Sequence, residues 1–240
     1  MKLGVIGGLG PQVTAYYYEL LVKMTDVERD QDHLEVIIHS CPQIPDRTEY
    51  ILQNQQENPL NKMKEVAQGL ENQGIDLLVI PCITAHYFYH ELTTYVHKPI
   101  IHLVEEIAHY LKKNHIQSVG IMATTGTIST LLFQNELKKY DIKCIIPSQQ
   151  RQEDVMKVIY DGVKKGQPID KDCFYRTSEE LFEKGAELII LGCTELSIVN
   201  KEMQLDERYL DALELLAATA LFQCHIKIKE EYQYLVNKGD

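Results

Sequence analysis

Positive charge is scarce in this sequence of 240 residues, where 24 Lys and Arg residues stand against 35 Asp and Glu residues. The formal net charge of −11 argues against nucleic acid or an anionic membrane surface as the main partner, because both attract basic proteins. A negatively charged small molecule would have to be held by a local positive site. We therefore expect no nucleic-acid partner.

Long apolar runs are also absent. No stretch approaches the roughly 18 to 20 residues that a membrane-spanning helix needs. The apolar start of the chain, residues 1–8, is too short and too rich in glycine for a signal segment, and it is better interpreted as a first strand with its turn. We expect no membrane partner and a cytoplasmic location.

Paired cysteine motifs are missing as well. None of the six cysteines belongs to a Cys-x-x-Cys motif, and the chain is too long for a small domain held together by disulfides. A lone cysteine is most simply a small buried apolar residue. We keep that interpretation for Cys144, Cys173 and Cys224.

Two other cysteines share one sequence context. Residues 78–86 read LVIPCITAH and residues 188–196 read LIILGCTEL, so that an apolar run stops at Cys82 in the first and at Cys193 in the second. Each cysteine is therefore expected at the C-terminal tip of a buried strand, at the entrance to a helix. That position is where α/β sheets carry their chemistry.

Strand and helix patterns alternate along the whole chain, and the strands are rich in β-branched residues. This is typical of parallel sheets covered by helices on both faces. Further anchors recur in the same order: residues 4–14 match 120–130, and residues 37–40 match 145–148. The sequence predicts an α/β protein of two similar Rossmann-like or flavodoxin-like domains with parallel sheets, related by a pseudo-two-fold axis, with the active site in the cleft between them.

The predicted domains interleave in the sequence. The first comprises residues 1–103 plus about 209–240, and the second comprises about 104–208. The long final helix, expected to begin near Asp206 or Tyr209, would then cross back to pack on the first domain.

Cofactor and metal motifs are incomplete. Residues 8–13 begin like a dinucleotide fingerprint, but Val13 stands where the third glycine is needed, and no Gly-Lys-Ser/Thr follows to make a Walker loop. Cys82 and His86 have the spacing of two metal ligands on a helix, yet the second copy has Ser197 in place of the histidine. A packed histidine is the simpler interpretation. We expect neither a cofactor nor a metal.

A matched pair of thiols suits proton transfer by two bases. If the domains face one another, Cys82 and Cys193 lie on opposite sides of a bound molecule, and a helix N-terminus favours the thiolate. One thiolate could remove a proton from a carbon atom while the other thiol returns one to the opposite face. That is racemisation without metal or cofactor. The alternative is two buried structural cysteines, placed alike only through duplication.

Five motifs resemble the aspartate/glutamate racemase family, and most closely its aspartate racemases. They are GGLGP at 7–11, IPDRT at 44–48, PCITAH at 81–86, ATTGT at 123–127 and LGCTEL at 191–196. They follow one another in order over nearly the whole chain. The resemblance implies an amino-acid racemase that works without pyridoxal phosphate, has two α/β domains with the site between them, and forms a homodimer.

The resemblance also assigns roles to residues. Cys82 and Cys193 would be the catalytic acid and base, Arg47 would hold a substrate carboxylate, and Lys164 would bind substrate, with the adjacent Lys165 as its competitor. Arg47 could instead pair with a neighbouring acidic residue, and Lys164 could be a solvated helix end. The remaining predicted substrate-binding residues are Gly10, Ile83, Thr84, Thr124, Thr127 and Thr194.

One departure affects the expected substrate. The family has Asn directly after the first cysteine, where this chain has Ile83, which removes a hydrogen-bond donor and an acceptor. We predict an aspartate racemase. One alternative is another enzyme on the same scaffold, such as a racemase of broad specificity or for non-acidic amino acids, a decarboxylase or an isomerase. The other is a two-lobed protein that binds an amino acid without catalysis.

Overall fold

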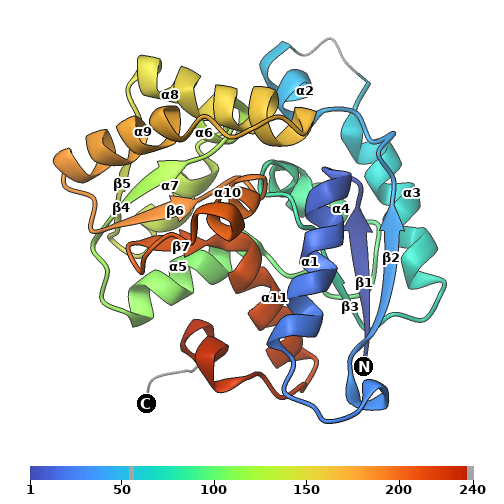
Figure 1. Cartoon of the computed structure of the whole chain (residues 1–240). Helices are drawn as coiled ribbons and strands as arrows, with labels where there is room; N and C mark the ends of the chain where they lie inside the picture. The colour runs from blue at the N-terminus through green and yellow to red at the C-terminus, as the bar shows by residue number, and fades with distance from the viewer. Residues whose placement is uncertain (54–56, 237–240) are drawn as a thin grey trace.

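The computed structural model describes residues 1–53 and 57–236, and over these residues the chain forms two parallel β-sheets with helices packed against them (Figure 1). The first sheet has the strand order β2-β1-β3, and the second has the order β5-β4-β6-β7. This confirms the predicted α/β class with parallel sheets. The strands are β1 Lys2–Gly7, β2 Glu35–Ser40, β3 Leu77–Val79, β4 Ser118–Met122, β5 Lys143–Ile145, β6 Leu188–Leu191 and β7 Tyr209–Asp211.

The internal repeat is visible in the strand register. In the first sheet Gly4 of β1 lies opposite Leu78 of β3, and in the second sheet Gly120 of β4 lies opposite Ile189 of β6. In both sheets the strand that precedes a motif cysteine pairs in parallel with the strand that opens its half of the chain. Parallel strands end at the same edge of a sheet, so both cysteines follow equivalent carboxyl ends.

We call the part of the chain that contains β1 to β3 the first half and the part from β4 onward the second half. Helices connect the strands in both halves. In the first half they are α1 Pro11–Met24, α2 Arg47–Gln53, α3 Pro59–Glu71, α4 Tyr89–Leu92 and α5 Leu103–Lys113, with 3₁₀ turns at Asp30–Asp32 and Thr84–Phe88. In the second half they are α6 Thr125–Ser129, α7 Leu132–Lys138, α8 Gln149–Met156, α9 Lys171–Glu183, α10 Leu196–Met203 and α11 Ala212–Gln223. A π-helical segment Lys157–Gly162 and a 3₁₀ turn Val163–Lys165 continue α8, and a further 3₁₀ segment spans Glu230–Leu235.

The turn after β1 needs glycine. Gly8 has a φ of 86°, and a side chain there would meet the backbone of Cys41. Pro11 then begins α1, where its missing N–H costs no helical hydrogen bond. This turn brings Gly10 and the start of α1 to the edge of the sheet where β1 ends.

Helix α11 joins the two halves. It is apolar on nearly every side, and it packs against α1 and α5 between the two sheets (Figure 1). A buried apolar cluster there combines Leu20 of α1, Ile107 of α5 and Ile190 of β6. The residues before it, Tyr209–Asp211, form β7 of the second sheet, so the helix begins later than predicted. The division of the chain into domains stays a prediction, with its boundary near residue 209 falling on a strand of that second sheet.

The segments after the cysteine strands differ from the expected helix entrances. Pro81 cannot donate to the sheet, β3 stops at Val79, and Cys82 N–H bonds the carbonyl of Ile80 at 2.7 Å in a tight turn. A 3₁₀ turn and the four-residue α4 follow Cys82, whereas Cys193 precedes the longer α10. Among the helices described, none combines the length and the apolar character that crossing a membrane requires.

Candidate active site

Cys82 and Cys193 line one narrow cavity between the two halves of the chain. Its volume is about 10 Å³, which is about the room that one water molecule needs. Both halves of the chain contribute residues to the walls of this cavity. The other lining residues are Leu9, Asp46, Arg47, Thr48, Ile83 and Thr84 from the first half, and Thr124, Tyr160, Lys164, Thr194 and Glu195 from the second.

A wider pocket of about 300 Å³ lies next to this cavity. It is lined by the turn after β1, including Gly10, and by the start of α1. Arg47, Lys164 and Glu195 line both spaces. The two spaces therefore share part of their walls, while the two thiols line only the inner one.

Residues from the two halves contact one another in the wall of the inner cavity. The Nζ of Lys164 lies 3.3 Å from Oδ2 of Asp46, and the hydroxyl of Tyr160 donates to the same oxygen at 3.3 Å. Burial opposes the charge of Asp46, but Lys164 and backbone N–H donors hold the pKa of Asp46 below its ordinary value. Asp46 also caps α2, since its Oδ1 accepts from the backbone N–H of Thr48 at 2.8 Å. The carboxylate is thus both a helix cap and a latch between the halves.

Threonine hydroxyls tie the halves together beneath this latch. The hydroxyls of Thr84, Thr124 and Thr127 lie 2.9 to 3.1 Å from one another. The hydroxyl of Thr194 donates to the carbonyl of Pro81 at 3.1 Å. Thr84, Thr124 and Thr194 line the cavity, whereas Thr127 lies behind it and Gly10 faces only the outer pocket.

Lys164 and Lys165 have different surroundings. The side chain of Lys164 is 24% exposed and lines the cavity. The side chain of Lys165 is 65% exposed and pairs with Asp161 at 2.7 Å. Burial alone would lower the pKa of Lys164, but Glu195 and Asp46 raise it above its ordinary value. The structure therefore brings Lys164, and not its neighbour, to the thiols.

Arg47 is buried in the cavity wall, and part of its guanidinium donates hydrogen bonds to backbone carbonyls. Its Nη1 donates to the carbonyl of Pro45 at 3.0 Å and its Nη2 to that of Leu9 at 2.9 Å, whereas Nε has no partner among the described residues. Burial opposes its charge, but Cys82, Asp46 and Glu195 raise the pKa of Arg47 above its ordinary value. Among the ion pairs of the described chain, none joins Arg47 to Asp46 or Glu49. The guanidinium is a fixed cation whose Nε is free to donate to a bound molecule.

The thiol of Cys193 is hydrogen-bonded to a carboxylate. Its Sγ donates to Oε2 of Glu195 at 2.9 Å, and both residues are buried. Burial and the adjacent Glu195 raise the pKa of Cys193 well above its ordinary value. The other oxygen of Glu195, Oε1, has no hydrogen-bond partner in the part of the chain that the structure describes. A Cβ at Gly10 would lie 3.2 Å from this oxygen, so glycine leaves room beside it.

His86 is packed rather than placed to bind a metal. It is buried, and its ring nitrogens lie 3.0 Å from the carbonyl of Cys82 and 3.3 Å from that of Ile101. Burial lowers the pKa of His86 to about 4, so the ring is neutral at physiological pH. Within residues 1–53 and 57–236, no group of three or more His, Cys, Asp or Glu side chains is arranged to hold a metal ion.

Comparison with known proteins assigns the chain to a family. A model of the Asp/Glu/hydantoin racemase family matches residues 6–220. The chain belongs to that family. The prediction of a racemase-type enzyme is thus confirmed at the level of the family, and the cysteine motifs fall inside the matched region.

Individual relatives agree with this assignment. The broad specificity amino-acid racemase RacX of Bacillus subtilis is 26% identical over 230 residues, which is 91% of this chain and 96% of RacX. The structure of the Picrophilus torridus aspartate racemase is 31% identical with a TM-score of 0.83, and 98% of each chain is covered. The glutamate racemase of Francisella tularensis in complex with D-glutamate shares the fold, with 18% identity, a TM-score of 0.66, and coverage of 100% of this chain and 84% of that one.

Several cavity residues had no predicted role. Glu195 belongs to the motif LGCTEL, and its position two residues after a cysteine was a usable signal. Asp46 and Thr48 lie in the motif IPDRT and gave a weaker one. Tyr160 carries no local signal, because its position depends on the π-helical segment and on contacts far along the chain.

Proposed function

We propose that this protein racemises an amino acid, with aspartate as the first candidate, by two-base proton transfer between Cys82 and Cys193 and without a cofactor. The observation that carries the proposal is that both thiols, Arg47 and Lys164 line the same narrow cavity. Two proton carriers and two cations are the groups that such a reaction on a dicarboxylic amino acid needs.

The proposed reaction exchanges one proton for another at Cα. A thiolate on one side takes the α-proton, and the electron pair of the broken C–H bond is delocalised into the α-carboxylate. The thiol on the other side then gives its proton to the opposite face of Cα. The two cysteines end with exchanged protonation states, and proton exchange with solvent restores them.

Electrostatic stabilisation has to supply most of the rate enhancement, because an α-proton is far less acidic than a thiol. The unused Nε of Arg47 and the ammonium of Lys164 are the positive groups of the cavity. Charge-assisted hydrogen bonds are strong in such a narrow site, which excludes bulk water. We assign the substrate carboxylates to these two residues, with the cavity threonines as further donors.

Substrate binding requires the cavity to open. Its volume of about 10 Å³ cannot hold an amino acid, so the contacts of Asp46 with Lys164 and Tyr160 have to separate. A substrate carboxylate would then replace Asp46 on Lys164. Reclosure would remove the reacting groups from water.

A second candidate is a racemase of broad specificity or for non-acidic amino acids. Ile83 favours it, because this buried apolar side chain lines the cavity and cannot bind a polar side chain of a substrate. The similarity to RacX is consistent with this candidate. In addition, Asp46 and Glu195 line the cavity together with Arg47 and Lys164, and these two acidic residues favour a substrate without a second carboxylate.

A panel of single-enantiomer amino acids in D₂O tests the proposal. We expect aspartate to give the opposite enantiomer with deuterium at Cα, measured by chiral chromatography with mass spectrometry. Faster conversion of a neutral or basic amino acid supports the second candidate. Binding of an amino acid, detected by thermal stabilisation, without deuterium at Cα would show a two-lobed binding protein and contradict both.

The composition and the family motifs also bear on cellular location and assembly. We propose a cytoplasmic homodimer without nucleic-acid or membrane partners, supported by the acidic composition and by the resemblance of the motifs. Light scattering coupled to size-exclusion chromatography tests the dimer. A mass of about one chain, 27.6 kDa, across the accessible concentrations contradicts it.

A further inference from the structure

The two cysteines have different partners although their sequence motifs match. The residue two positions after Cys193 is Glu195, whose Oε2 accepts from the thiol at 2.9 Å. The residue two positions after Cys82 is Thr84, whose hydroxyl is engaged with other threonines. A carboxylate partner therefore exists on one side of the pair only.

The contact between Cys193 and Glu195 determines where a proton lies. An ionised carboxylate only accepts hydrogen bonds, so the proton of this hydrogen bond belongs to sulfur. Removing it would place a thiolate 2.9 Å from a carboxylate in a buried site, where like charges repel strongly. The thiol form of Cys193 is therefore favoured as long as Glu195 is charged.

Other charged groups around this contact act in both directions. Lys164 faces it from the 3₁₀ turn after α8 and lowers the pKa of Cys193, against burial, Glu195 and Cys82, which raise it. Asp46 and Tyr160 engage the ammonium of Lys164 from the other side. Burial and Glu195 outweigh the lysine, and the pKa of Cys193 is raised.

Cys82 lacks such a carboxylate partner. Among the hydrogen bonds of the described residues, none joins the Cys82 thiol to an acidic side chain, and the buried guanidinium of Arg47 lines the same cavity. The charge of Arg47 acts on Glu195 as well as on Cys82, so Arg47 does not by itself distinguish the two thiols. The difference between them is that only Cys193 has a carboxylate partner.

Building on the proposed function, we infer that Glu195 is a positioning residue that holds the transferable proton on Cys193, so that Cys193 is the acid and Cys82 the base of the resting enzyme. The resting enzyme then accepts directly the enantiomer whose α-hydrogen faces Cys82. Turnover leaves a thiol at Cys82 and a thiolate at Cys193. Return to the resting state moves one proton from Cys82 to solvent and one from solvent to Cys193.

Alkylation of the two thiols across pH tests this inference. Iodoacetamide reacts with thiolates, and mass spectrometry of peptides reports Cys82 and Cys193 separately in one sample. In the wild-type protein we expect Cys193 to reach half-maximal alkylation rate at a higher pH than Cys82. In Glu195→Gln the midpoint of Cys193 falls by about one pH unit or more, a rate gain of about tenfold near neutral pH, because the amide removes the charge and can donate to the thiolate.

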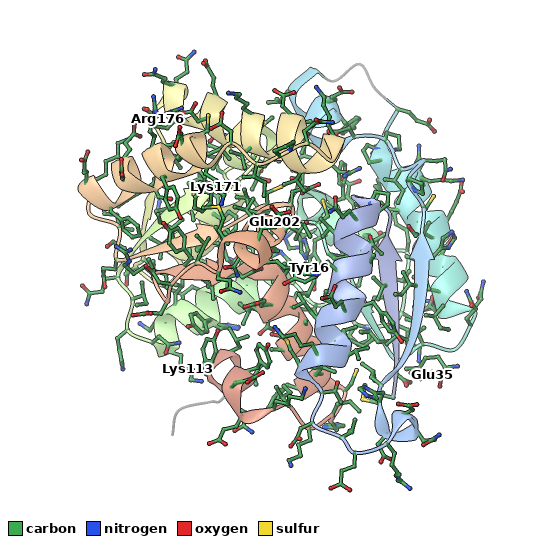
Figure 2. All side chains as sticks on the ribbon, in the orientation of Figure 1. Tyr16, Glu35, Lys113, Lys171, Arg176 and Glu202 are labelled. Carbon is green, nitrogen blue, oxygen red and sulfur yellow. The ribbon has the colours of Figure 1, made fainter. Side chains whose placement is uncertain are left out.

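Glu202→Gln is the matched control. Glu202 is an exposed residue of α10, labelled in Figure 2, and its substitution makes the same change of charge away from the cavity. Its profiles should equal those of the wild type. An unmoved midpoint of Cys193 in Glu195→Gln overturns the inference. So does a wild-type protein in which Cys193 reacts at lower pH than Cys82, and that result decides the matter even if the variant fails to fold.

Racemisation across pH separates this inference from the proposed function. If the wild-type enzyme converts no amino acid, the proposed function fails while the alkylation profiles still report on Glu195. If it is active, kcat plotted against pH should fall off at a lower pH on its alkaline side in Glu195→Gln than in the wild type, because Cys193 loses its proton at a lower pH. A uniform decrease of kcat with an unchanged alkaline fall-off indicates a purely structural role and contradicts the inference.

Discussion

The Cys82 side and the Cys193 side of the cavity have the same backbone origin and different chemistry. Each cysteine follows the carboxyl end of a strand that pairs in parallel with the first strand of its half. The side chains that follow differ: Ile83 and Thr84 on one side, Thr194 and Glu195 on the other. Duplication thus explains where the thiols lie, and the residues that follow them give a carboxylate partner to Cys193 only.

The largest expected effect comes from removing either thiol. Cys82→Ser and Cys193→Ser should each decrease racemisation by at least about 10²- to 10⁴-fold, since each removes one proton carrier. Polarimetry or chiral chromatography measures the loss. Cys144→Ser, at a half-buried cysteine outside the cavity, is the control and should keep wild-type activity. Wild-type racemisation by either of the first two variants would show that two opposed thiols are not required.

The variant Arg47→Ala tests whether the buried guanidinium of the cavity binds a substrate carboxylate. Arg47→Ala should raise KM for aspartate by about 10- to 100-fold, which corresponds to the loss of a charge-assisted hydrogen bond of about 1.5–3 kcal/mol. The KM for alanine, which lacks the second carboxylate, should change much less. Equal changes for both substrates would mean that Arg47 acts mainly by holding the carbonyls of Leu9 and Pro45.

The residue directly after the thiol is apolar on one side, Ile83 after Cys82, and polar on the other, Thr194 after Cys193. Variants of Ile83 test whether this difference affects substrate choice. Ile83→Asn should raise the preference for aspartate over alanine in kcat/KM by about two- to tenfold, the range of one net hydrogen bond. It should also destabilise the protein by about 1–3 kcal/mol, because an amide replaces a buried apolar side chain. Ile83→Val keeps the site apolar and should leave the preference unchanged. An unchanged preference in Ile83→Asn would place substrate selection elsewhere.

The latch between the halves should give the smallest effect. Asp46→Asn keeps a cap for α2 and removes the charge that pairs with Lys164, so KM for aspartate should fall by about two- to fivefold, as expected for a partly exposed ion pair. Asp161→Asn, which breaks the exposed pair with Lys165, is the matched control. A rise in KM for Asp46→Asn would mean that Asp46 helps to bind substrate instead of competing with it.

Much of the architecture follows from local sequence patterns. The amphipathic spacing of residues 103–113 predicts α5 with its observed ends, and Pro11 and Pro59 mark the starts of α1 and α3. The paired motifs predict that both cysteines follow strand ends at one cleft. These features are predictable because period, capping and strand composition act within a few residues.

Other features depend on contacts between distant segments. The break between α6 and α7 at Leu131, which has a φ of 57°, interrupts a local helix pattern. β7 is three residues long and exists because it pairs with β6. The carbonyls that occupy Arg47, and the latch from Asp46 to Lys164, join segments that only the folded chain brings together.

Deuterium exchange in the two single cysteine variants tests the central claim most directly. Each variant is incubated in D₂O with pure L- or D-aspartate, and deuterium at Cα of the unconverted enantiomer is measured by mass spectrometry. Two opposed bases predict that Cys82→Ser exchanges only one enantiomer and Cys193→Ser only the other. Exchange of both enantiomers by one variant, or of the same enantiomer by both, would contradict the assignment of the two thiols to opposite faces of the substrate.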